Sequence, residues 1–327
     1  MVFISQEQYA LEIVARFGLQ DANGCSTPME PKLDWSLCSN DIHLSDDQKK
    51  QYQAAIGSLI YLMLGSRPDL AFSINKLAQY SSRPTERHWR GVKRILRFVK
   101  RTTFTALELG DRQKPSNPLL HHSVIGYFDA AYMDNTADSH STMGYLFLLY
   151  GSTISWASKK QQTIALSTTE AEYLAGTEAT KECMWIIAFL GSLGIKLDGP
   201  VKLLGDNQGA NALAKNPTYH ARTKHIGGRQ RFLSEMVEQR IIEVSYIPTA
   251  DMAADTLTKA LPRDSYDSFM SLMGLHSFPS RGEVALMCSE CLESFRSRNT
   301  LHRHIRNKHQ GPNMKEGGSG TGEVGGH

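Results

Sequence analysis

The chain has 327 residues, of which 41% are hydrophobic and 21% charged, and its formal net charge is +3 at pH 7. This composition is that of an ordinary globular protein with room for about two to three folded units. The charge is too small by itself to indicate a polyanionic partner. Residues 1–10 lack the apolar core of a signal peptide, and stretches such as Trp185–Leu190 are too short to span a bilayer, so no membrane partner is expected.

The five cysteines do not suggest a disulfide framework. Cys288 and Cys291 are close together, whereas Cys25, Cys38 and Cys183 are scattered. This distribution favours a reducing compartment and one metal site. We therefore expect an intracellular protein, located in the nucleus or the cytoplasm.

The first part of the chain, residues 1–110, is predicted to be mainly helical. Apolar residues recur at helical spacing in Gln6–Phe17, and a second helix runs from Asp46 to about Gly65. A third helix begins near Thr85 and continues to about Lys100. The polar, proline-marked stretch Cys25–His43 is predicted to be an irregular connection.

The third of these helices has an apolar side and basic residues elsewhere on its surface. Its apolar side holds Trp89, Val92, Leu96 and Val99, and its basic residues are Arg90, Arg94, Arg97 and Arg101. The basic residues could follow a phosphate backbone, or they could form the solvated face of a packed helix. The sequence leaves both interpretations open.

The period of the apolar pattern changes near residue 123, where strands replace helices. A Ser-x-x-Glu capping pattern at Ser167 and Glu170 begins a long helix that ends near Gly191. The predicted order is β-β-β-α-β-α-α-β-α, an α/β fold with a mixed sheet flanked by helices. The strands are 124–129, 145–150, 152–165, 201–205 and 241–247, and the shorter helices are 208–215, 224–239 and 251–259.

Four acids in this part could form a metal site. Asp129 and Asp206 each end a predicted strand, Glu172 lies in the first turns of the long helix, and Asp255 follows the last strand. Ligand sites gather at the carboxyl ends of strands in open α/β sheets, and Mg²⁺ prefers carboxylate oxygens. A single acid at such a position is more often a cap or a solvated residue, so spacing alone is a weak signal.

Several motifs in residues 122–275 together resemble the RNase H domain of copia-type retrotransposon polyproteins. They are Gly126-Tyr127-Phe128-Asp129-Ala130-Ala131-Tyr132, Ser141-Thr142-Met143-Gly144-Tyr145, Ile154-Ser155-Trp156-Ala157-Ser158-Lys159-Lys160-Gln161, Ala165-Leu166-Ser167-Thr168-Thr169-Glu170-Ala171-Glu172-Tyr173, Asp206-Asn207, His220-x-Arg222-Thr223-Lys224-His225-Ile226 and Ala254-Asp255-Thr256-Leu257-Thr258-Lys259.

The resemblance implies an RNase H-like domain that cleaves the RNA strand of RNA–DNA hybrids. It assigns Asp129, Glu172, Asp206 and Asp255 as catalytic acids that hold two Mg²⁺ ions. Glu170 lies two residues from Glu172 and points to another side of the helix, and the family pattern favours Glu172.

The sequence departs from the family pattern at three positions, although no predicted ligand is lost. Ala131 stands where many relatives have a second aspartate, and Gly227 and Arg231 replace residues that are often Asp and His. His225 either contacts phosphate or is an ordinary residue at a helix start. Basic residues that would suit the hybrid backbone are Lys159, Lys160, Arg222 and Lys224.

Residues 4–110 resemble the segment of the same polyproteins that joins the reverse transcriptase palm to RNase H. The motifs that carry this resemblance are Cys25-Ser26-Thr27-Pro28-Met29, Tyr52-x-x-x-Ile56-Gly57-Ser58-Leu59-x-Tyr61-Leu62 and Arg67-Pro68-Asp69-Leu70. The Tyr-x-Asp-Asp polymerase signature is absent from the sequence, so no DNA polymerisation is expected of it.

A Cys2His2 zinc finger of the ββα type is predicted over residues 286–310. Cys288, Cys291, His304 and His309 have the residue types and spacing that bind one tetrahedral Zn²⁺. Double-stranded DNA is one candidate partner, which the docking geometry of such fingers would contact through Ser297, Thr300 and Arg303. Ser277–Gly282 is predicted to be a linker, and the glycine-rich residues 311–327 a disordered tail.

Two functions remain open on the sequence. The first is a retrotransposon-derived, metal-dependent nuclease of RNA–DNA hybrids. The second is a catalytically idle, transposon-derived protein whose zinc finger binds nucleic acid. Neither function predicts an oligomeric state.

Overall fold

The computed structural model describes residues 2–31, 33–38, 40–110, 124–216 and 228–277, together with 286–287, 294–295 and 304. The chain divides into two compact units, Met1–Ser277 and Phe278–His327. The first unit contains the predicted helical segment and the predicted α/β domain.

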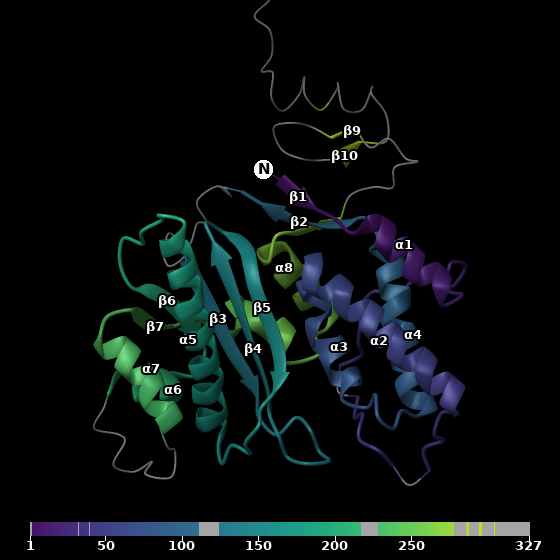
Figure 1. The fold of residues 1–327 in the computed structure, drawn as a ribbon, viewed down its shortest axis with the longest axis horizontal. Coiled ribbons are helices and arrows are strands. Elements are labelled where there is room, and N and C mark those ends of the chain that lie inside the picture. Colours follow the sequence, from purple (N-terminus) through teal and green to yellow (C-terminus); the bar gives the residue numbers. More distant parts are fainter. Residues whose placement is uncertain are drawn as a thin grey trace, which may run out of the picture. The chain divides into compact units, whose positions relative to one another are not determined.

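The front of the first unit is a group of helices packed around an apolar core, which lies on the right of Figure 1. Ser45 and Gln48 cap the second helix reciprocally, as the capping-box pattern requires. The helices are α1 (Glu7–Arg16), α2 (Asp46–Ser66), the 3₁₀ turn η1 (Pro68–Leu70), α3 (Ala71–Ala78) and α4 (Glu86–Arg101).

A five-stranded mixed sheet with strand order β5-β4-β3-β6-β7 forms the centre of the unit. β3 is antiparallel to β4 and parallel to β6, which is parallel to β7. The register pairs Tyr127 of β3 with Leu204 of β6. Asp129 and Asp206, each two residues further along, therefore lie at the same edge of the sheet. The strands are β3 (Val124–Ala131), β4 (Thr142–Leu149), β5 (Ser152–Lys160), β6 (Val201–Gly205) and β7 (Ile242–Tyr246).

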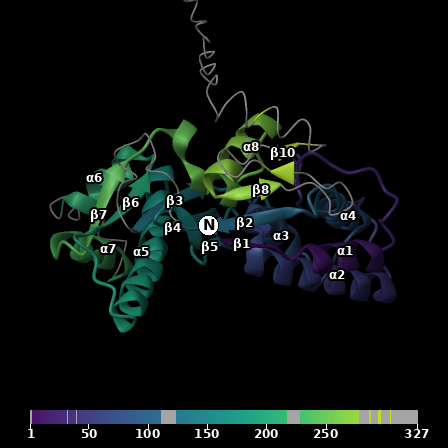
Figure 2. The same ribbon diagram turned by 90° about the horizontal axis from the view of Figure 1, so that it is seen from above.

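The sheet separates two apolar cores because successive side chains of a strand point to opposite faces. Phe128 and Phe147 belong to one core, and their neighbours Tyr127 and Leu146 belong to the other. The first core is covered by α5 (Thr168–Ser192), α6 (Gln208–Lys215) and α7 (Gly228–Glu238), on the left of Figure 2. The second core is shared with the front helices, η5 (Ala253–Leu257) and α8 (Arg263–Leu272).

The predicted segments 1–110 and 122–275 are thus parts of one compact unit. They are also joined through the backbone by a small sheet of order β1-β2-β8, formed by β1 (Val2–Ile4), β2 (Thr105–Leu109) and β8 (Leu275–Ser277). A buried polar network connects them as well. The Arg67 guanidinium donates to both carboxylate oxygens of Asp69 at 2.9 and 2.8 Å, and the Tyr266 hydroxyl donates to Asp69 Oδ2 at 3.0 Å.

Most predicted elements are present, and the differences have local causes. The second predicted helix ends at Ser66, close to the expected Gly65. Pro68 then begins η1, where its missing N–H costs nothing, and α3, which was not predicted, follows at once. The helix predicted over residues 251–259 is instead two 3₁₀ turns, η4 (Thr249–Asp251) and η5. α8 and the small three-stranded sheet were not predicted.

η5 lies directly against β4 near the edge where the acids gather. Gly144 makes this approach possible, because a Cβ at this position would lie only 2.6 Å from the Cβ of Leu257. Gly144 is also the residue that pairs with Asp129 across the two strands. The absence of a side chain at Gly144 therefore lets η5 reach Asp129.

None of the helices in the described residues is both long and apolar enough to cross a membrane. In the second unit, β9 (Leu286–Met287) pairs antiparallel with β10 (Ser294–Phe295). The predicted zinc ligands Cys288, Cys291 and His309 lie outside the described residues, as does the predicted tail 311–327.

Candidate active site

Asp129, Glu172 and Asp206 converge where β3, β6 and the start of α5 meet. One carboxylate oxygen from each of the three lies within 4.8 Å of the other two. Asp129 is 2% exposed and Glu172 is 6% exposed, so little water screens their charges. Ser167 fixes the start of α5, since its hydroxyl accepts a hydrogen bond from the backbone N–H of Glu170. The structure thus brings three of the four predicted acids together.

Asp255, the fourth predicted acid, lies beside this group but not within it. Its Oδ1 atom is 2.8 Å from the ammonium of Lys259, which is also 3.9 Å from Oδ2 of Asp129. Lys259 therefore supplies a counter-charge close to both aspartates. Asp255 and Lys259 are four residues apart and close enough to pair across one turn.

Two threonine hydroxyls hold carboxylates of the group in place. Thr258 donates a short hydrogen bond to Oδ2 of Asp129, and Thr249 donates to Oδ2 of Asp206 at 2.8 Å. Each bond occupies one oxygen of its aspartate and restricts the rotation of the side chain. The positions of Asp129 and Asp206 are therefore fixed by η4, η5 and the residue that follows η5, as well as by the sheet.

The electrostatics of the group oppose its full ionisation. Burial raises the pKa of Glu172 well above its usual range, and the charges of Asp129 and Asp206 raise it further. Burial, followed by the charge of Asp129, also raises the pKa of Asp255. Burial works against the charge of Lys259, yet attraction from Asp129 and Asp255 raises the pKa of this lysine.

The residues fit a divalent cation. The buried Oε2 atom of Glu172 has no hydrogen-bond partner among the described residues. Glu172 is one of the converging carboxylates. A buried acceptor of this kind is costly unless a cation or a donor satisfies it. Carboxylate oxygens at this spacing are the ligands that Mg²⁺ prefers. Asp129, Glu172 and Asp206 could therefore hold such an ion.

The sequence analysis did not assign roles to Thr249, Thr258 or Lys259. Thr258 and Lys259 are part of the motif Ala254–Lys259, so their presence near Asp255 was visible. Their contacts with Asp129 were not, because 129 residues separate Thr258 from it in the chain. Thr249 reaches Asp206 only because β6 and β7 are neighbours.

The structure describes two of the residues that were predicted to contact nucleic acid. Lys159 lies at the end of β5 with its ammonium 5.6 Å from the centre of the Tyr145 ring. Lys160, the next residue, forms an ion pair with Asp138. The remaining predicted contacts lie outside the described residues; they are Arg222, Lys224, Ser297, Thr300 and Arg303.

The basic side of α4 is largely engaged with the protein. Arg94 pairs with Glu30 at 2.6 Å, and Arg97 donates to the backbone carbonyl of Asn23 at 2.6 Å. Lys100 likewise donates to the carbonyl of Ala22. These contacts anchor the segment before α2, whereas Arg90 and Arg101 are exposed, so both interpretations of α4 stay open.

No family model matches the chain, but proteins similar to it in sequence are known. The chain is 39% identical over 279 residues to the retrovirus-related Pol polyprotein from transposon TNT 1-94 of Nicotiana tabacum, which covers 84% of this chain and 20% of that protein. It is also 42% identical over 135 residues to the secreted RxLR effector protein 161 of Plasmopara viticola, covering 41% of this chain and 90% of that protein. Among solved structures, RNase H1 from Halobacterium salinarum aligns with 44% of this chain at 19% identity and a TM-score of 0.28.

The chain is therefore similar over 84% of its length to retrotransposon Pol polyproteins, and its fold is an α/β fold with a mixed five-stranded sheet. It spans about a fifth of the length of the Pol polyproteins that it matches.

Proposed function

We propose that the chain is a metal-dependent ribonuclease that cleaves the RNA strand of RNA–DNA hybrids. The observation that carries the proposal is the convergence of Asp129, Glu172 and Asp206 within 4.8 Å at the edge of the sheet. Similarity to retrotransposon Pol polyproteins supports the same chemistry. Two Mg²⁺ ions held by these acids would supply an activated water and charge stabilisation for the leaving oxygen.

In this reaction the protein residues would bind the metal ions and keep the metal-binding side chains oriented. Asp129, Glu172 and Asp206 would hold the ions, with Thr258 and Thr249 keeping the two aspartates in fixed rotamers. Lys259 pairs with Asp255 and lies near Asp129, so its positive charge would balance the acids before ions bind. Asp255 would complete the site from η5.

The test is cleavage of a hybrid whose RNA and DNA strands carry different labels. Purified protein with Mg²⁺ should shorten the RNA strand and leave the DNA strand intact. Asp206→Asn, which keeps the shape of the side chain and removes its charge, should abolish cleavage. No cleavage by the wild type, or cleavage that survives this substitution, would refute the proposed function.

The second candidate function is nucleic-acid binding by a Cys2His2 zinc finger in the second unit. It is supported by the spacing of Cys288, Cys291, His304 and His309, and by the β9–β10 pair that flanks the two cysteines. If the finger carries the main function, Cys291→Ser should abolish nucleic-acid binding while Asp129→Asn should leave it unchanged. A gel-shift titration of both variants against duplex DNA distinguishes the two functions.

A further inference from the structure

Lys259 is a positive charge that the chain itself places beside the acids. It follows η5 by two residues, and its ammonium lies 2.8 Å from Oδ1 of Asp255 and 3.9 Å from Oδ2 of Asp129. A cation is therefore already in contact with one of these aspartates and near the other. Any metal ion that binds Asp255 must share this position with the ammonium or take it over.

The contact between Lys259 and Asp255 is an ion pair without a well-aligned hydrogen bond. Oδ1 of Asp255 is buried and has no hydrogen-bond partner among the described residues, although the ammonium is 2.8 Å away. The attraction is therefore that of two charges, and the lone pairs of this oxygen stay open to a better partner. Asp255 shares this feature with Glu172, whose buried Oε2 is in the same condition.

Lys259 is the movable member of this group. Its side chain is 40% exposed, whereas the side chains of Asp129 and Asp255 are 3% and 7% exposed. Its flexible four-carbon stem can turn toward solvent at the cost of a partly exposed ion pair, and such pairs are weak. Asp129 cannot move in the same way, because Thr258 donates a hydrogen bond to its Oδ2 atom.

The lysine affects the two parts of the acid group unequally. Asp129, Glu172 and Asp206 converge without Asp255. Among the described residues, the ion pairs of Lys259 are with Asp129 and Asp255, and the contact with Asp255 is the closer one. Like charges repel more strongly the closer they are. Lys259 therefore opposes a cation at Asp255 directly and a cation at the three converging acids much less.

We propose that Lys259 competes with a second divalent cation for Asp129 and Asp255, so that the acids bind two ions in separate steps of unequal affinity. The lysine stays in place when the three converging acids take the first ion. It must turn away from Asp255 before that aspartate takes part in holding the second. Lys259 is thus a positioning residue that controls how many ions the site holds. The inference rests on the proposed function, because it takes the four acids as metal ligands.

The stoichiometry of bound ions tests this inference without relying on cleavage. Mn²⁺ is titrated into the full chain without a hybrid and with one equivalent of zinc, and electron paramagnetic resonance measures the unbound ion. The wild type should bind a first Mn²⁺ and then a second at least about tenfold more weakly. Lys259→Met should tighten the second step about tenfold, and Lys259→Arg, which keeps the charge, should not. Lys259→Gln is a second neutral variant, and thermal melts should confirm that each variant is folded.

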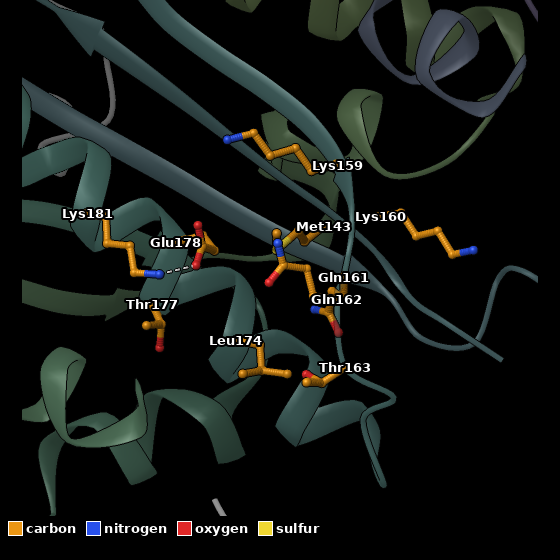
Figure 3. Close-up of a pocket in the computed structure, with 10 residues that line it drawn as sticks. All are labelled: Met143, Lys159, Lys160, Gln161, Gln162, Thr163, Leu174, Thr177, Glu178 and Lys181. Atoms are coloured by element: carbon orange, nitrogen blue, oxygen red, sulfur yellow. Dashed lines mark hydrogen bonds and ion pairs between the residues drawn. The ribbon is translucent and has the colours of Figure 1, made fainter. Parts of the chain in front are cut away.

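Lys181→Met is the matched control, because Lys181 also pairs with a carboxylate and its side chain is 48% exposed. Figure 3 shows this lysine beside its partner Glu178 on α5, nine residues after Glu172 and about 14 Å further along the helix axis. The substitution removes the same charge at a distance from the acids and should leave both binding steps unchanged. Adding Asp255→Asn to Lys259→Met should remove the second step and keep the first.

Chemical labelling follows the lysine itself. An amine-reactive reagent is applied at each stage of the titration, and mass spectrometry measures the modification of Lys259 peptide by peptide. The modification should be slow in the metal-free protein and after the first ion, and should rise several-fold as the second ion binds. Lys181 in the same sample should react at a constant rate.

The outcomes distinguish this inference from the proposed function. If the wild type does not cleave a hybrid but Lys259→Met tightens the second step, the nuclease proposal fails and the role of Lys259 stands. If the second step is equally weak in the wild type and in Lys259→Met, the inference is overturned. Equal tightening of both steps would also overturn it, because competition for Asp255 acts on one step. So would the absence of saturable Mn²⁺ binding, whether or not the wild type cleaves.

Discussion

Replacing Glu172 by glutamine should make the metal-free protein more stable, although it removes a residue of the proposed active site. Glu172 is buried within 4.8 Å of carboxylate oxygens of Asp129 and Asp206. Two unit charges at that distance repel by about 3 kcal/mol at an effective dielectric constant of about 20. In the wild type, protonation of Glu172 already relieves part of this repulsion. We therefore expect Glu172→Gln to raise the free energy of unfolding by about 1–2 kcal/mol.

The pH dependence follows from the raised pKa of Glu172. At a pH below about 4.5, the pKa of Glu172 in the unfolded protein, the side chain is protonated in both the folded and the unfolded state. The folded protein then carries no electrostatic penalty from Glu172. As the pH rises through and above that value, the unfolded state ionises more readily than the folded one. The metal-free wild type should therefore lose stability as the pH rises toward neutrality and beyond, and Glu172→Gln should lack this component of the loss.

Thermal unfolding monitored by circular dichroism, first in EDTA and then with increasing Mg²⁺, measures both effects. A gain of 1 kcal/mol corresponds to about 2–4 °C in the melting temperature of a unit this large. Mg²⁺ should raise the melting temperature of the wild type, because ions that bind only the folded state stabilise it, and should raise that of Glu172→Gln much less.

Glu170→Gln is the matched control, since it makes the same chemical change two residues away on the same helix. The Glu170 carboxylate accepts a hydrogen bond from the backbone of Leu166 at 2.9 Å near the start of α5. Its loss should slightly destabilise the protein and leave the response to Mg²⁺ intact. A lower melting temperature for Glu172→Gln in EDTA, or an equal response of both variants to Mg²⁺, would refute the reasoning.

Three other substitutions test the surroundings of the site by urea denaturation. Lys259→Met should destabilise the metal-free protein by about 1 kcal/mol, because Asp255 loses its counter-charge in a partly exposed pair, and Mg²⁺ should recover the loss. Arg67→Met should cost about 3–5 kcal/mol, since it leaves the buried carboxylate of Asp69 without a cation. Gly144→Ala should cost about 1–3 kcal/mol by forcing η5 away from β4, and hybrid cleavage should fall with it. A variant whose urea midpoint equals that of the wild type would contradict the contact that its substitution disturbs.

The sequence was sufficient to predict the strands and the helix around three of the four acids. Asp129 and Asp206 follow apolar runs that became adjacent parallel strands, and Glu172 follows a serine cap that does begin a helix. Both patterns are local, and the family resemblance supplied the pairing between them. The structure brings these three residues together, and their roles as catalytic, metal-binding acids stay a prediction.

Contacts between distant segments could not be predicted in the same way. Tyr266 reaches Asp69 across 197 residues, and no pattern around either residue indicates this pairing. The pairing of Asp255 with Lys259 is likewise one that the four-residue spacing permits but does not require. Residues that satisfy one another across the fold are determined by tertiary packing, and only the structure shows them.

The central claim is that Asp129, Glu172 and Asp206 form a binding site for divalent cations. Titration of the full chain with Mn²⁺, followed by electron paramagnetic resonance of the unbound ion in the presence of a hybrid, measures this directly. Zinc is supplied throughout, so that the four predicted zinc ligands are not left open to manganese. We predict saturable Mn²⁺ binding by the wild type that is lost in Asp129→Asn and competed by Mg²⁺. Equal Mn²⁺ binding by the wild type and by Asp129→Asn would contradict the claim.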